Sequence, residues 1–150
     1  MIFGDEMKIS HITTIKAQFF DVDSMDVVWH GNYVKYLETA RCELLSKIGY
    51  DYKKMKMDGF AYPIVKLDIK YIKPIFFGDE IEIETILTEF ESFLKFHYII
   101  KNPSTKAKLS EANTSQVAVD MRTMQTCFFL PEEIKNAIKR YENETNDPAC

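Results

Sequence analysis

The chain has 150 residues, of which 28% are charged and 46% hydrophobic, and its formal net charge is -4. This balance is typical of a folded globular protein and excludes a largely disordered chain. The lysines are scattered among acidic residues, which excludes a basic stripe for nucleic acid, and no apolar run reaches the roughly 20 residues that a membrane-spanning helix needs.

The length predicts a single domain. Residues 1–7 read MIFGDEM and lack the basic start and the apolar core of a secretory signal, so we expect a cytoplasmic protein. Three widely spaced cysteines contain no CxxC pair, and they indicate neither a disulfide framework nor a cysteine-based zinc site.

The first third of the chain predicts a strand and a long helix. Residues 11–20 are rich in Ile, Thr and Phe, which favours a strand. From about Gly31 onward, apolar residues recur at three- and four-residue steps and predict a helix of about seventeen residues. Asn32 is the expected cap of this helix and Gly49 its expected stop. Residues 51–59 are expected to form a short helix or a loop.

The rest of the chain predicts an antiparallel sheet and a terminal helix. Strand candidates follow one another at residues 65–71, 80–87, 94–100 and 109–121. Turn residues separate them, and such short connections favour hairpins. A short strand near 126–129 precedes a helix opened by Pro131, with a frayed tail from residue 143. One amphipathic helix and one face of a curved sheet can bury each other, which predicts an α+β fold.

The most informative stretch is residues 21–33, which read DVDSMDVVWHGNY. Three acids and a histidine gather where the first strand gives way to the helix. Charged groups are costly beside an apolar helix unless they stay in water or do chemistry. The free amides at a helix start favour an anion or a polarised carbonyl. A carboxylate facing such amides suits attack on an acyl carbon.

This stretch, with YLETAR at 36–41, resembles the signature of the hotdog-fold acyl-CoA thioesterases, in the 4-hydroxybenzoyl-CoA thioesterase and YbgC-like group. Similarity continues through YIKP at 71–74 and LPEE at 130–133, and it covers about residues 8–141. The resemblance implies one hotdog domain, in which an antiparallel sheet wraps around a long central helix. It implies hydrolysis of an acyl-CoA or another pantetheine thioester, with acyl carrier protein as the alternative carrier. It also implies a homodimer or homotetramer with the active site between subunits, and no cofactor or metal apart from the coenzyme A of the substrate.

The resemblance assigns the catalytic carboxylate, as nucleophile or general base, to Asp23. By its position alone, Asp23 is more simply a cap of the helix or of a turn. Asp21 is expected to be a loop or capping residue. Asp26 stands where the family usually has glycine, so we expect it in a left-handed turn, which aspartate tolerates.

Two catalytic roles for His30 compete with that of an ordinary exposed residue. Its backbone N–H, expected in the first turn of the helix, matches the family's donor to the thioester carbonyl. Its imidazole could instead orient water or protonate the leaving thiolate. Trp29, Gly31 and Tyr33 are expected to bind substrate, although the two aromatic residues suit core packing equally well.

Glu38 and Arg41 lie three residues apart on the expected helix. They match the family's helix pattern, and we interpret them as a structural pair. On a helix surface such a pair contributes only a few tenths of a kcal/mol.

Two other functions are alternatives to thioester hydrolysis. A hotdog module that binds acyl-CoA without cleaving it is the alternative from a different class, but the presence of both Asp23 and the HGNY helix start favours a hydrolase. A hotdog dehydratase would need a different Asp/His arrangement. The chain contains no GxSxG, P-loop or GxGxxG motif, so serine hydrolase, nucleotide hydrolase and Rossmann functions have no support.

Overall fold

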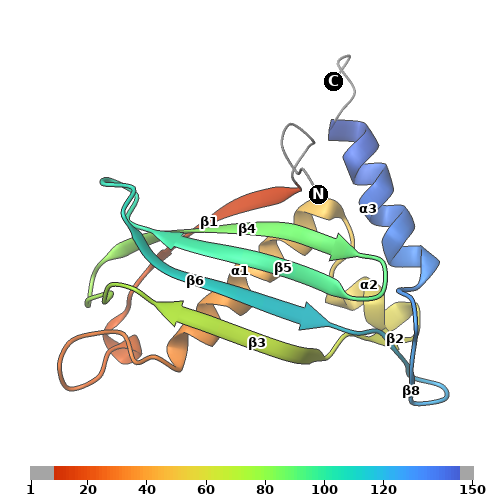
Figure 1. Cartoon of the computed structure of the whole chain (residues 1–150), viewed down its shortest axis with the longest axis horizontal. Helices are drawn as coiled ribbons and strands as arrows, with labels where there is room; N and C mark the ends of the chain where they lie inside the picture. Colours follow the sequence, from red (N-terminus) through yellow and green to blue (C-terminus); the bar gives the residue numbers. More distant parts are fainter. Residues whose placement is uncertain (1–8, 146–150) are drawn as a thin grey trace.

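A long helix lies against one face of a curved antiparallel sheet in this computed structural model, which describes residues 9–145 (Figure 1). The sheet has five strands in the order β1-β4-β5-β6-β3. Its strands are β1 (Ser10–Lys16), β3 (Ile64–Tyr71), β4 (Glu80–Phe90), β5 (Leu94–Lys101) and β6 (Lys108–Gln116). The helix is α1 (Asn32–Ile48). The predicted arrangement of an antiparallel sheet against a long central helix is confirmed.

Smaller elements complete the fold. They are the 3-10 helix η1 (Phe19–Asp21), helices α2 (Tyr52–Met57) and α3 (Glu132–Thr145), and the short strands β2 (Phe60–Ala61), β7 (Val119–Asp120) and β8 (Gln125–Thr126), which form a second sheet. The predicted run 109–121 is thus divided between β6 and β7. Helix α3 reaches Thr145, beyond the expected start of fraying, and residues 146–150 lie outside the described part of the chain.

Helix α1 has 17 residues, the length that the sequence predicts. It ends at Gly49, whose φ of 91° is left-handed, a conformation that glycine adopts without the steric cost of a Cβ. The expected cap is wrong by one residue, because Gly31 is the N-cap. Asn32 is the first helical residue, and its side chain donates to the carbonyl of Asp21, which fastens the helix to the preceding loop.

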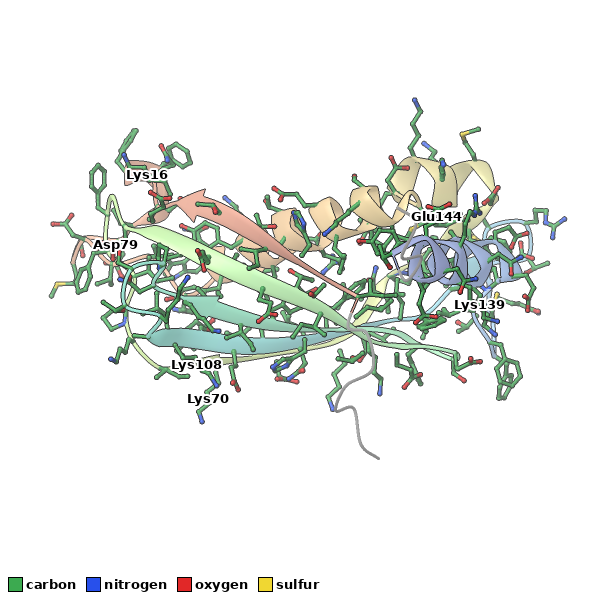
Figure 2. The ribbon with its side chains drawn as sticks, turned by 90° about the horizontal axis from the view of Figure 1, so that it is seen from above. Lys16, Lys70, Asp79, Lys108, Lys139 and Glu144 are labelled. Atoms are coloured by element: carbon green, nitrogen blue, oxygen red, sulfur yellow. The ribbon has the colours of Figure 1, made fainter. Side chains whose placement is uncertain are left out.

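The core lies between α1 and the concave face of the sheet. Strands β4 and β5 alternate buried and partly exposed positions, as expected for strands covered on one face. Their buried residues pack against the apolar stripe of α1, which includes Leu37, Leu44 and Leu45. Figure 2 shows the opposite face, where the side chains of Lys70 and Lys108 point away from the helix.

Strand β3 is formed as predicted, but the apolar side of its alternation is not fully buried. Leu67 and Tyr71 pair with Thr114 and Ser110, so they lie on the concave face with the core. They nevertheless stay 40% and 47% exposed. The reason is their position, because β3 is an edge strand and α1 lies mainly against β1 and β4, toward the other edge.

Arg41 is not the surface residue that its spacing from Glu38 predicts. Its side chain is only 3% exposed, and it pairs with Glu38 at the edge of the core. Its guanidinium also donates to the hydroxyls of Tyr52, at 2.8 Å, and Tyr98, at 3.1 Å. The structural interpretation of the pair holds, but the guanidinium connects α1 to α2 and β5 inside the protein.

None of the helices among the described residues is both long enough and apolar enough to span a membrane. The cytoplasmic location stays a prediction.

Candidate active site

The acidic segment forms a tight loop at one end of the sheet, beside η1 (Figure 1). Val22 and Val28 form an isolated bridge, and inside it the N–H of Asp23 donates to the carbonyl of Val27 at 2.9 Å. Asp26 has a φ of 62°, so the expected left-handed conformation is confirmed. This conformation is the reason that glycine or aspartate suits the position.

A buried carboxylate fastens this loop to α1. Asp21 is 5% exposed, and its Oδ2 accepts hydrogen bonds from the hydroxyl of Tyr36 and from the N–H of Gln18, each at 2.9 Å. The carbonyl of Asp21 accepts from Asn32 Nδ2 at 2.7 Å and from the N–H of Trp29 at 3.0 Å. Burial, followed by the hydrogen bond to Asp21, raises the pKa of Tyr36, so its hydroxyl remains a donor. Asp21 is therefore the anchor of the loop that carries Asp23.

Asp23, His30 and Tyr33 lie together around a pocket of about 370 Å³. The other lining residues are Val27, Val28, Tyr71, Ile72, Lys73 and Pro74. The structure therefore brings three of the predicted site residues together at the start of α1.

The Asp23 side chain is exposed, and its two carboxylate oxygens differ in their hydrogen bonding. Its Oδ1 accepts the N–H of Met25 at 2.8 Å, which is the turn-capping role that its position alone predicts. Within residues 9–145, its Oδ2 has no hydrogen-bond partner. One oxygen thus holds the turn, and the other is not engaged by the described part of the protein.

The backbone on either side of His30 is held through its carbonyl groups. The carbonyl of Trp29 accepts from the N–H of Asn32 at 2.9 Å, and the carbonyl of His30 accepts from the hydroxyl of Tyr71, also at 2.9 Å. Within the described residues, the N–H groups of His30 and Gly31 donate to no protein group. His30 precedes the helix instead of lying in its first turn, because α1 begins at Asn32. Its N–H is nonetheless an unused donor beside the pocket.

The three predicted substrate-binding residues differ in their surroundings. Tyr33 is buried and lines the pocket, so it serves both packing and lining. Trp29 is exposed, and its indole lies over Gly31 so closely that a Cβ there would come within 2.4 Å of the ring. Trp29 and Gly31 are not among the residues that line the pocket, although the Trp29 and His30 rings lie 5.2 Å apart.

Tyr71 and Lys73 belong to the pocket but were not predicted as site residues. Tyr71 lies edge-on to Tyr33 at 4.8 Å between ring centroids, and Lys73 adds a positive charge to the lining. Both lie in the YIKP segment at 71–74. In the sequence, that segment contributes to the family resemblance, but it does not predict the hydrogen bond between Tyr71 and His30.

A family model described as the thioesterase-like superfamily matches residues 18–138. The chain belongs to this superfamily. Among its relatives is the acyl-CoA thioester hydrolase YbgC of Escherichia coli O157:H7, which is 29% identical over 112 residues, covering 74% of this chain and 83% of YbgC.

Solved structures of similar proteins have the same fold. The hypothetical protein TT1821 from Thermus thermophilus is similar at 30% identity and a TM-score of 0.77, over 87% of this chain and 98% of that protein. The DHNA-CoA thioesterase from Staphylococcus aureus is similar at 25% identity and a TM-score of 0.76, over 92% of this chain and 96% of the relative. At the level of the superfamily, the predicted class of thioester hydrolase is confirmed.

Proposed function

We propose that this thioesterase-superfamily member hydrolyses acyl-CoA to a carboxylic acid and free coenzyme A, with Asp23 as its catalytic carboxylate. The observation that carries the proposal is the pocket at the start of α1, where Asp23 and His30 share one lining. The names of YbgC and of the DHNA-CoA thioesterase support coenzyme A as the carrier. A thioester on acyl carrier protein is the second candidate, because its pantetheine arm presents the same bond.

In the proposed reaction, Asp23 acts in one of two ways. It attacks the thioester carbonyl carbon and forms an anhydride that water then opens, or it takes a proton from the water that attacks. In either case the carbon–sulfur bond breaks, and the thiolate leaves and takes up a proton, for which the His30 imidazole is the nearby acid. The reaction uses protein groups and water, and it needs no metal or redox cofactor.

The His30 N–H is proposed to donate to the carbonyl oxygen as negative charge develops there. Such a fixed donor is typically worth about 3–4 kcal/mol in the transition state. Trp29, Gly31 and Tyr33 are proposed to contact the substrate around this point.

Free-thiol release from a panel of thioesters tests the activity. We expect the purified protein to release thiol from at least one member of a panel of short, long and aromatic acyl-CoAs and one acyl carrier protein thioester. The rate should exceed that of buffer alone. Tight binding of acyl-CoA with no thiol release would contradict the proposal and support the non-catalytic binding module.

We further propose that a second copy of the chain pairs with the free edge of β3. This edge strand carries exposed apolar side chains on the concave side, and Ile72, just past the strand, is exposed as well. Unpaired strand edges with apolar side chains favour pairing with another chain. Two copies joined here would form a homodimer, and a homotetramer would need a second contact.

A charge on this edge tests the homodimer. Because a two-fold interface contains each residue twice, Leu67→Glu should raise the dimer dissociation constant roughly a hundredfold, as measured by analytical ultracentrifugation. The matched control is Ile12→Glu on β1, the opposite edge strand, where Ile12 is 56% exposed. If Ile12→Glu raises the dissociation constant more than Leu67→Glu does, the interface lies on the β1 edge, and the proposed pairing of β3 edges is wrong.

A further inference from the structure

Tyr71 connects the edge strand β3 to the backbone in front of α1. Its hydroxyl donates to the His30 carbonyl at 2.9 Å, across 41 positions of the sequence. Its ring is also held edge-on against Tyr33, at 4.8 Å, and against His30, at 6.3 Å. The phenol therefore has a fixed direction, although its side chain lies at the surface.

The hydrogen bond to this carbonyl orients a donor as well as an acceptor. The bond between His30 and Gly31 is a trans peptide, since the described residues contain no cis peptide bond. In a planar trans peptide, the carbonyl and the N–H that share it point in opposite directions. The His30 carbonyl accepts from the Tyr71 hydroxyl at 2.9 Å and, less closely, from the N–H of Tyr33 at 3.4 Å. Tyr71 makes the shorter of these two hydrogen bonds, and through it helps to set the direction of the Gly31 N–H.

The neighbouring peptide is held in the same manner. The Trp29 carbonyl accepts the N–H of Asn32 at 2.9 Å, which sets the direction of the His30 N–H. Two consecutive peptides are thus fixed by their carbonyls, and within the described part of the chain their N–H groups donate to no protein group. Residues 30 and 31 lie in a turn, and successive free N–H groups in a turn conformation can form an anion-binding concavity.

We infer that Tyr71 is a positioning residue for the proposed thioesterase reaction, and that it holds the Gly31 N–H as a second donor to the thioester carbonyl oxygen beside the His30 N–H. This role rests on the proposed function. A donor fixed before the reaction costs no reorganisation when the oxyanion forms, so its benefit appears in the transition state. In this proposal the Tyr71 hydroxyl acts through the His30 carbonyl and does not itself donate to the thioester carbonyl.

The hydroxyl is suited to this role at neutral pH. Burial raises the pKa of Tyr71, so the phenol stays protonated and continues to donate. The pKa of Tyr33 is likewise raised, first by burial and then by Tyr71, so neither ring of the pair introduces a negative charge next to the developing oxyanion.

Tyr71→Phe tests the inference because it removes only the hydroxyl and leaves the ring contacts. With an acyl-CoA that the wild type hydrolyses, we expect kcat to fall about tenfold and KM to stay nearly constant. The matched control is Tyr62→Phe, since the buried Tyr62 hydroxyl has no hydrogen-bond partner in the described part of the chain. This control should keep the wild-type kcat.

A second measurement separates positioning from general damage to the pocket. An S-alkyl-CoA, in which a methylene replaces the carbonyl, should inhibit wild type and Tyr71→Phe with the same Ki, because it has no oxygen for the two amides. A fall in kcat smaller than about threefold, or a parallel rise in this Ki, overturns the inference while leaving the thioesterase proposal intact. If the wild type releases no thiol from any thioester, the proposed function fails and the role of Tyr71 falls with it.

Discussion

Asp21→Ala is expected to lower the free energy of unfolding by about 3 kcal/mol. The buried carboxylate accepts two hydrogen bonds, from the Tyr36 hydroxyl and the Gln18 N–H, and alanine leaves both donors without it. Removing one member of a buried hydrogen bond costs more than the bond itself contributes, because the remaining group stays desolvated. For a chain of this size the midpoint of thermal unfolding should fall by roughly 6–12 °C.

Tyr36→Phe is the matched control for this change. It removes one of the two donors and leaves the Asp21 carboxylate with the other, so we expect a loss of only about 1 kcal/mol. Urea unfolding of wild type and both variants measures the difference, at one protein concentration because association alters apparent stability. Equal losses in the two variants would show that Asp21 is not the anchor of the loop.

The sequence predicts elements whose formation depends on local pattern. The recurrence of apolar residues and the glycine at position 49 predict both the length and the end of α1. The two-residue alternation predicts the strands, and the departure from glycine at Asp26 predicts its left-handed backbone. Each of these depends on residues close together in the chain.

Features that depend on distant parts of the chain were missed. The exposure of Leu67 follows from where α1 lies on the sheet, and the burial of Arg41 follows from two tyrosines on other elements. Periodicity says which face a residue occupies but not what covers that face.

The same limit applies to the site. Asp23, His30 and Tyr33 lie close together in the sequence, within residues 21–33, and the structure places all three around one pocket. Tyr71 could not be assigned in advance, because its contact with His30 joins residues 41 positions apart. The helix start was misplaced by a residue, because the Asn32 side chain bonds to Asp21 and not to the helix amides.

Asp23→Asn is expected to lower kcat about a thousandfold, because an amide can neither attack the carbonyl nor take a proton from water. The substitution keeps an Oδ1 that can accept the N–H of Met25, so the turn remains capped. Loss of activity should therefore come without loss of the fold. Asp26→Asn is the matched control, since it removes a negative charge from the same loop, and asparagine tolerates the left-handed backbone at that position.

The most direct test is kcat for thiol release by wild type, Asp23→Asn and Asp26→Asn, on a thioester that the wild type hydrolyses. We predict a loss of about a thousandfold in Asp23→Asn alone, with Asp26→Asn within a few-fold of wild type. Turnover by Asp23→Asn within about tenfold of the wild-type rate would contradict the assignment of the catalytic carboxylate.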